Sequence, residues 1–456
     1  MVRHEFTDNA YVLEFAIDWR GWRLQRDSAQ HYSYKGTGIA SAVSLCSPDA
    51  GDFWEDEAMD FTFNEQEEAF RKEVEDFINN ELPADWVEKN TYWPAGYGTL
   101  AQFEELSPQV EQFTRRLAEK GWLAISWPKE YGGAGLSHTE QAIFHERMSY
   151  YRAPAGEVAT LIGGPTVMLF GSEEMKKEWL PKIARGEIRF WLAYSEPNAG
   201  SDLSSIQTRA IEDGDDLIIN GQKIWGTAAH VSHYAWMAVR TDPMAPPHKG
   251  ISLVIVDNTS PGVTIRPLMN ICGIYSFNEV FFDNVRVPKK NVVGEMNKGW
   301  YYLMVALDFE RLVIPIGSFR RTFEEIVQYA RETKHNGQVL SRQLLIRNKL
   351  VNIAIQIEIA YMFFWRTAWM LDRGLVPNIE ASLLKLFTTE LSQKLANTGM
   401  QVMGHYGQLE STSKWSSLQG RVCLGYLDCI SALVGAGTSE IQRNIIAMRG
   451  LGLPPK

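Results

Sequence analysis

The chain has 456 residues, of which 45% are hydrophobic and 22% are charged. This length exceeds one typical hydrophobic core, so we expect two or three domains, and the composition is that of a globular protein. The net charge of −10 and the lack of any Lys/Arg-rich run argue against a nucleic-acid-binding surface. We therefore expect the partner to be a small molecule or another protein.

Cysteine usage and hydropathy indicate the compartment. The four cysteines, Cys46, Cys272, Cys423 and Cys429, show no C-x-x-C spacing, which is typical of free thiols in a cytosolic protein. The most apolar long segment, 350–371, is interrupted by two amides, a glutamate and an arginine, which a bilayer-spanning helix does not readily carry. We predict a cytoplasmic protein without a membrane span, in which this segment is a core helix.

Residues 1–58 differ from the rest of the chain, because they show no sustained helical period and no signal-peptide core. We expect a poorly ordered N-terminal extension, with an over-called start codon upstream of Met59 as one explanation. Beyond it, Asn64 and Glu67 have the spacing of a helix capping box, and the apolar residues that follow share one helical face. Residues 59–187 are therefore predicted to form a helical domain.

The hydrophobic period changes to two over residues 188–292. Residues 211–216 and 219–222 have the composition of hairpin turns, 251–256 is rich in β-branched residues, and 281–288 ends another alternating segment. We expect a small β-domain here.

Helical periodicity returns in residues 293–456. Long helices are predicted near 342–372, 378–403 and 437–449, with few long loops between them, which favours a four-helix bundle. The predicted fold is α+β, with an N-terminal helical domain, a central β-domain and a C-terminal helical bundle.

The segment Trp191 to Ser205 joins an apolar run to a Glu-Pro turn and a small-residue loop. Gly200 can adopt backbone angles closed to other residues, and Pro197 fixes its own φ. Such a loop can direct backbone N–H groups, with the Ser195 and Ser201 hydroxyls, at a flat polar heterocycle or a phosphate. By itself the segment also fits a simple capped turn.

The run A-Y-S-E-P-N-A-G-S-D-L-S-S at 193–205 resembles the flavin-site signature of the acyl-CoA dehydrogenase family, with Tyr194 where an aliphatic residue is usual. Five further stretches match in the family's order, and together they cover about residues 59–454. The resemblance implies the three-domain fold above, FAD as cofactor and an acyl-CoA substrate of lipid β-oxidation. It also implies an electron-transferring flavoprotein that reoxidises the FAD.

A second match is G-Q-K-I-W-G-T at 221–227. An indole beside a small residue and a hydroxyl can stack on an isoalloxazine ring while the threonine bonds to its polar edge, although an isolated strand tryptophan is usually core packing. The resemblance makes this stretch the flavin wall. The residues it places against FAD are Leu192, Tyr194, Ser195, Ser201, Trp225, Gly226, Thr227, Gln401, Gly404, Thr438 and Glu440.

The candidate catalytic base lies in L-D-F-E-R-L-V at 307–313. A carboxylate followed by arginine is ordinarily a salt-bridged surface group, but oxidation at Cα–Cβ of a thioester needs a base for the α-proton, and desolvation raises a carboxylate pKa towards the working range. The family's more common base position is occupied here by Ala436, which cannot accept a proton. This combination resembles the isovaleryl-CoA dehydrogenase arrangement and assigns the base to Glu310. Substrate contacts are assigned to Ser201, Asp308 and Arg311.

Two departures from the family pattern concern FAD retention. The family's R-x-x-F-G, whose arginine reaches a neighbouring subunit's FAD pyrophosphate, aligns with T-K-H-N-G at 333–337, and its Q-x-x-G-G-x-G loop reads Q-V-M-G-H-Y-G at 401–407, with His405 replacing a glycine. Because arginine–phosphate contacts are charge-assisted and bidentate, losing one is expected to weaken FAD binding.

Three functions are compatible with these motifs. The first is a catalytic acyl-CoA dehydrogenase in which Glu310 removes the α-proton while the flavin accepts the β-hydride, assembled as a homotetramer or as a heterotetramer with a related subunit. The second is a flavin-poor structural or regulatory subunit of a heteromeric dehydrogenase, and the third is a flavin-dependent oxidase or monooxygenase of the same fold. The sequence has no G-x-G-x-x-G, no metal-spaced His pair and no G-x-S-x-G, which disfavours nicotinamide-dependent and serine-hydrolase chemistry and leaves no candidate metal site.

Overall fold

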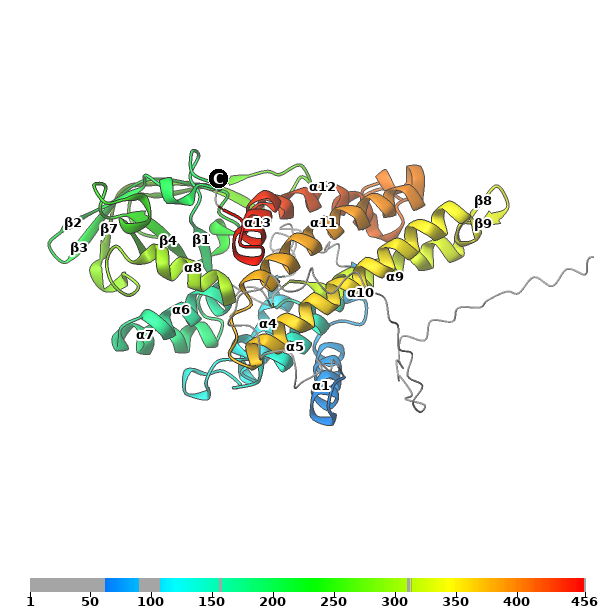
Figure 1. Cartoon of the computed structure of the whole chain (residues 1–456), viewed down its shortest axis with the longest axis horizontal. Coiled ribbons are helices and arrows are strands. Elements are labelled where there is room, and N and C mark those ends of the chain that lie inside the picture. The colour runs from blue at the N-terminus through cyan, green and yellow to red at the C-terminus, as the bar shows by residue number, and fades with distance from the viewer. Residues whose placement is uncertain (1–61, 90–106, 156–157, 310–311, 313, 455–456) are drawn as a thin grey trace, which may run out of the picture. The chain divides into compact units, whose positions relative to one another are not determined.

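The computed structural model describes residues 62–89, 107–155, 158–309, 312 and 314–454. These belong to one of two units of the chain, Phe61–Lys456, and the predicted extension 1–58 lies outside the described residues. Along the chain, a helical region is followed by one mixed sheet and then by a second helical region (Figure 1). The predicted α+β fold is therefore confirmed.

The first helical region comprises α1 (Glu65–Glu81), α2 (Trp86–Lys89), α4 (Ser107–Glu119), α5 (His138–Tyr150), α6 (Gly164–Phe170) and α7 (Glu173–Ala184). The predicted capping box begins α1: Asn64 Oδ1 accepts a hydrogen bond from Glu67 N at 2.9 Å, and the Glu67 carboxylate accepts one from Asn64 N at 2.8 Å. The buried face of α1 packs on Trp122, which in turn contacts Phe144 of α5 edge to face. A π-helical turn, η3 (Ala159–Gly163), leads into α6.

The sheet has seven strands: β1 (Phe190–Ala193), β2 (Arg209–Asp213), β3 (Asp216–Ile224), β4 (Tyr234–Arg240), β5 (Ile251–Asp257), β6 (Val263–Leu268) and β7 (Phe277–Pro288). The order along it is β1-β4-β2-β3-β7-β6, with β5 paired to β4. The strands predicted from 251–256 and 281–288 are confirmed as parts of β5 and β7. Strand β4 pairs parallel with β1 and antiparallel with β5, and α8 and α6 pack near this side of the sheet.

One of the two predicted hairpin turns is confirmed and the other is wrong. Gly214, with a φ of +62°, lies in the tight turn between β2 and β3, within the predicted segment 211–216. Residues 219–222 are not a turn but lie inside β3, at a bulge where the pairing with β7 shifts. Glycine is required at position 221 because a Cβ there would lie 2.5 Å from Oγ1 of Thr208, the residue before β2.

The second helical region comprises α8 (Gly299–Phe309), α9 (Ile316–Glu332), α10 (Leu344–Asp372), α11 (Asn378–Met403), α12 (Arg421–Val434) and α13 (Ser439–Ile445). Helices α9 to α12 share one aliphatic and aromatic core, which confirms the predicted bundle. A small hairpin of β8 (Lys334–His335) and β9 (Gln338–Val339) connects α9 to α10. Among the described residues no single helix combines the length and apolar composition needed to cross a bilayer, and 418–434 with 439–450 meet that test only as a pair bent by 40°.

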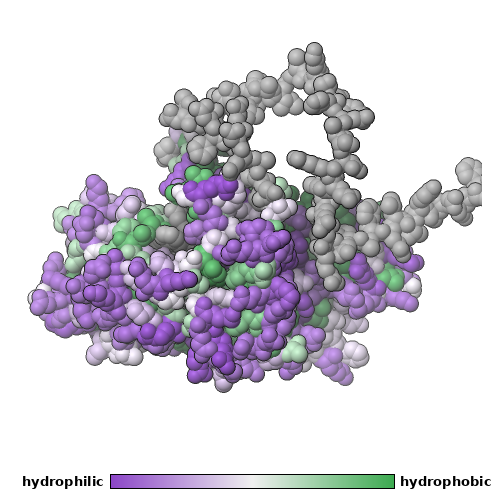
Figure 2. Space-filling view, turned by 90° about the horizontal axis from the view of Figure 1, so that it is seen from below, coloured by the Kyte–Doolittle hydropathy of each residue, from purple (hydrophilic) through white to green (hydrophobic). Residues whose placement is uncertain are grey.

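Most of the face shown in Figure 2 is hydrophilic, with hydrophobic residues in small separate patches. A longer apolar stripe is present on α10, where Leu344, Val351, Ile355 and Met362 are 54–70% exposed. Their spacings of seven, four and seven place them on one helical face. No described segment of the chain covers this face of α10.

Candidate active site

A buried ion pair links the ends of β1 and β3, the two strands that carry the motifs. Lys223 Nζ lies 2.8 Å from Glu196 Oε1 and also donates to the Tyr194 carbonyl at 3.0 Å. The Glu196 carboxylate accepts two further hydrogen bonds, from Gln207 N at 2.6 Å and from Thr208 N at 2.9 Å. One carboxylate therefore holds both ends of the loop that carries the small-residue motif.

The electrostatics of this pair follow from its burial. Burial lowers the pKa of Lys223 to about 8, although the charge of Glu196 acts in the opposite direction. Burial alone would raise the pKa of Glu196, but the charge and hydrogen bond of Lys223 outweigh it, so this pKa is lowered. Neither residue was among the site residues predicted from the sequence. The signal was present, because alternation in β3 places Leu217, Ile219 and, after the bulge, Lys223 on the buried face.

Trp225 has an unusual backbone for a bulky residue, with a φ of +63°, and it is 59% exposed. Neighbouring hydrogen bonds hold this conformation: Gly226 N donates to the Asn278 carbonyl at 3.0 Å, and Asn278 Nδ2 donates to the Gly226 carbonyl at 2.8 Å. A Cβ on Gly226 would lie 2.6 Å from the Trp191 ring. The local fold thus keeps a large flat indole at the surface, with Phe277 edge-on at 6.2 Å.

The structure brings most of the sequence-predicted flavin contacts of the β-domain together. Ile224 N donates to the Ser195 carbonyl at 3.0 Å, which joins the segment after β1 to the strand end before Trp225. Ser201 is exposed, Ser195 and Thr227 are half-buried, and the Tyr194 side chain is buried. We call residues 195–202 and 225–227 the platform. A flat indole surface beside accessible hydroxyls, stiffened by a buried ion pair, fits an isoalloxazine ring.

The loop before α13 contains the C-terminal site residues. Thr438 caps this helix by accepting a hydrogen bond from Ile441 N at 3.2 Å. The buried Lys385 of α11 donates to the Gly437 carbonyl at 2.7 Å and so fixes the loop from inside. Ala436 has a φ of +52° and is exposed, as is Glu440.

Gln401 and Gly404 do not join this group. Lys385, which contacts the Thr438 loop, lies sixteen residues before Gln401 on the continuous helix α11, and at about 1.5 Å per residue the separation is about 24 Å. The hairpin of residues 334–339, which overlaps the altered R-x-x-F-G stretch at 333–337, also lies away from α13 (Figure 1). In one chain, these two groups of predicted FAD contacts are therefore separated by more than half the length of α11.

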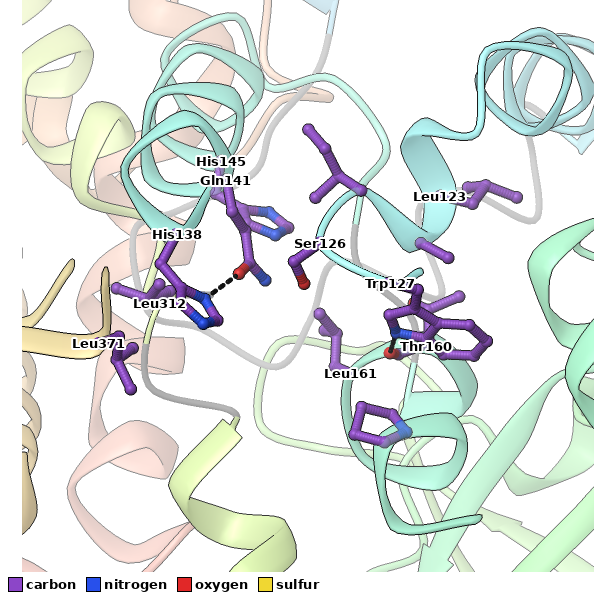
Figure 3. Close-up of a pocket in the computed structure, with 13 residues that line it drawn as sticks. Leu123, Ser126, Trp127, His138, Gln141, His145, Thr160, Leu161, Leu312 and Leu371 are labelled. Atoms are coloured by element: carbon purple, nitrogen blue, oxygen red, sulfur yellow. Dashed lines mark hydrogen bonds between the residues drawn. The ribbon is translucent and has the colours of Figure 1, made fainter. Parts of the chain in front are cut away.

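A pocket of about 70 Å³ lies between α5, the segment after α4, the π-helical turn η3 and the start of the bundle (Figure 3). Its wall includes Trp127, which belongs to the segment that follows α4. The Trp127 Nε1 donates to the Thr160 carbonyl at 3.1 Å, and glycine at 164 leaves room for its ring, since a Cβ there would lie 1.9 Å from it. Its lining residues are Leu123, Ala124, Ile125, Ser126, Trp127, His138, Gln141, His145, Thr160, Leu161, Pro165, Leu312 and Leu371.

The predicted base and its neighbours are only partly described. Glu310 and Arg311 lie outside the described residues, and of Asp308 the structure describes the backbone alone, in the last turn of α8. Leu312, two residues after Glu310 in the sequence, is buried and lines the pocket. The assignment of Glu310 stays a prediction.

Comparison with known proteins identifies the family. Models of the N-terminal, middle and C-terminal domains of acyl-CoA dehydrogenases match residues 64–187, 192–285 and 297–451. Acyl-CoA dehydrogenase FadE26 of Mycobacterium tuberculosis is 34% identical over 87% of this chain and 99% of its own length.

Solved structures agree. The Tcur3481-Tcur3483 steroid ACAD has a TM-score of 0.79, and the ChsE4-ChsE5 complex from Mycobacterium tuberculosis has a TM-score of 0.78. Each is 32% identical and covers 87% of this chain and 100% of the matched chain. This chain belongs to the acyl-CoA dehydrogenase family of FAD-dependent oxidoreductases.

Proposed function

We propose that this protein introduces a Cα–Cβ double bond into an acyl-CoA thioester and passes the electrons to an electron-transferring flavoprotein. The observation that carries the proposal is the platform, where an exposed indole in a strained backbone lies beside a loop held by a buried ion pair. Bound FAD would supply the hydride acceptor. Trp225 would hold the ring system by stacking, while Ser195, Ser201 and Thr227 would hydrogen-bond its polar edge.

The α-proton would be removed by Glu310. Its sequence neighbours Leu307, Phe309 and Leu312 are apolar, and Leu312 is buried. Desolvation by apolar neighbours raises the pKa of a carboxylate and brings it closer to that of a useful base. Ser201, Asp308 and Arg311 would contact the substrate, and Ala436 cannot act as an alternative base.

We infer that the site is completed by a second subunit. Gln401 and Gly404 lie about 24 Å along α11 from the loop that carries Thr438, and we assign them to the FAD of a neighbour. The exposed apolar stripe on α10 supplies a surface for such a contact, and one similar structure is a complex of two differently named chains. A homotetramer or a heterotetramer with a related subunit is proposed.

A flavin-poor subunit of a heteromeric dehydrogenase is the second candidate. It is favoured by Thr333 in place of the family's arginine and by the exposed His405 in place of a glycine. The ordered platform favours the catalytic role instead. The domain boundaries 59–187, 188–292 and 293–456 and a cytoplasmic location stay part of the proposal.

One spectroscopic experiment tests the proposal. The purified protein should show the absorbance of oxidised flavin, and anaerobic addition of one of a panel of acyl-CoAs should bleach it. The panel should include straight, branched and steroid side-chain thioesters, because one similar structure is a steroid ACAD. A colourless protein that FAD cannot reconstitute, alone or with a co-expressed partner, would contradict the catalytic role.

A further inference from the structure

The polar lining of the pocket beside Trp127 contains a buried nitrogen with no partner. His145 on α5 is 7% exposed, and its Nε2 has no hydrogen bond within the described part of the chain. Figure 3 shows His145 and Gln141 extending from one wall towards Ser126 on the facing segment. A buried imidazole nitrogen left without a partner reduces stability, so a ligand atom that supplied one would be favoured here.

Other polar groups of the lining can also form hydrogen bonds with a ligand in the pocket. His138 Nδ1 lies 3.1 Å from Gln141 Oε1, so the carboxamide oxygen is engaged and its NH₂ group faces the pocket side. None of the described residues that line the pocket is an Asp, Glu, Lys or Arg. Burial also lowers the pKa of His145 to about 4, so the ring is neutral near pH 7 and offers one donor and one acceptor.

The pocket is small, and one of its lining residues, Leu312, is two residues from the proposed base in the sequence. Its volume is several times the roughly 10–15 Å³ that a single water molecule needs, enough for the end of a chain but not for a whole acyl-CoA. Leu312 connects its wall to the segment that carries the proposed base. The π-helical turn η3, which supplies Thr160 and Leu161, is of a type often found at functional sites.

We propose that the pocket binds the far end of the substrate's acyl group and that His145, Gln141 and Ser126 recognise a neutral hydroxyl or carbonyl oxygen there. This inference rests on the proposed acyl-CoA dehydrogenase function. A carboxylate would meet no cationic side chain among the described lining residues, and a methyl group would leave the imidazole nitrogen unpaired, so both are disfavoured.

The test uses pairs of acyl-CoAs that differ only in a terminal hydroxyl or a terminal methyl group, over a series of chain lengths. With the FAD-loaded wild type, kcat/KM for flavin bleaching should favour the hydroxyl member by about tenfold or more at the length that reaches the pocket. The ratio should fall to about one in His145→Leu and recover in part in His145→Gln, which keeps a donor and an acceptor. His248→Leu, an exposed site outside the pocket, serves as the matched control and should keep the wild-type ratio.

A binding measurement makes the result independent of turnover. The rise in Tm on adding each thioester should be larger for the hydroxyl member in the wild type and equal for both members in His145→Leu. Equal Tm shifts and equal rates at every length in the wild type would overturn the inference, as would a carboxylate-terminated chain that binds better than the hydroxyl one. If no thioester bleaches the flavin, the proposed function fails, and the Tm comparison still decides the role of the pocket.

Discussion

The platform and the pocket differ in how their buried polar groups are satisfied. On the platform, Glu196 accepts hydrogen bonds from a lysine and two backbone amides, so the loop has its shape before any ligand binds. In the pocket, His145 Nε2 is buried without a partner in the described chain. A preformed platform suits a cofactor that stays bound, whereas an unsatisfied pocket suits a substrate group that completes it and leaves. Substitutions in the platform and substitutions in the pocket should therefore change different measured properties.

The largest expected effect is on the rate of flavin reduction, because it depends on removal of the α-proton by the proposed base. Glu310→Gln keeps the shape of the side chain but cannot take the α-proton, so bleaching by a good substrate should slow by about 10²–10⁴-fold. FAD content should be unchanged, and the exposed Glu174→Gln should behave as the wild type. If stopped-flow measurements show that the Glu310→Gln variant is reduced at the wild-type rate, Glu310 is a structural carboxylate and not the base.

Breaking the buried ion pair of the platform should lower the free energy of unfolding. Lys223→Met leaves the Glu196 carboxylate buried and unpaired, and breaking a buried pair costs about 3–5 kcal/mol of unfolding free energy. FAD should also be released more easily, because the loop loses its anchor. Lys290→Met is the control: its pair with Glu178, at 3.4 Å, is largely exposed and should contribute less than about 1 kcal/mol. Equal urea midpoints for the two variants would show that the buried pair does not hold the loop.

The sequence predicted those parts of the molecule that depend on local pattern. The capping box at Asn64 and the alternation in the strands specify their own elements, and the two motif stretches lie together in the structure, as the resemblance implied. The turn expected at 219–222 was wrong because Asn and Gly also occur at bulges, and only the contact of Gly221 with Thr208 distinguishes the two.

The pocket could not be predicted in this way. His145, Trp127 and Leu312 come from distant segments, and no local spacing relates them. The resemblance assigned FAD contacts to both Gln401 and Thr438. Only the length of α11 in the structure shows that the two residues lie far apart in one chain.

Burial of His145 should make the free energy of unfolding depend on pH. The unfolded chain takes up a proton on His145 as the pH falls through about 6.5, whereas the folded protein does so only near pH 4. The unfolded state therefore binds more protons in this window, and stability falls as the pH drops from 6.5 to 4. The contribution is on the order of 3 kcal/mol, and His145→Leu should flatten the curve by that amount in urea titrations at each pH. His248→Leu should follow the wild-type curve, and an unchanged slope in His145→Leu would show that the ring finds a partner in solution.

The smallest expected effect tests whether Trp225 serves the ligand rather than the fold. A non-glycine residue in the left-handed region costs about 1–3 kcal/mol, and glycine removes most of that cost. Trp225→Gly and Trp225→Ala both lose the indole, so both should bind FAD more weakly by fluorescence titration. They differ in backbone strain, so the glycine apoprotein should be about 1 kcal/mol more stable than the alanine one. If the indole were core packing, both variants would instead lose about 3–5 kcal/mol of unfolding free energy. Because the ring is 59% exposed, we expect the opposite pattern: the fold tolerates or gains from the change, and the cofactor is lost.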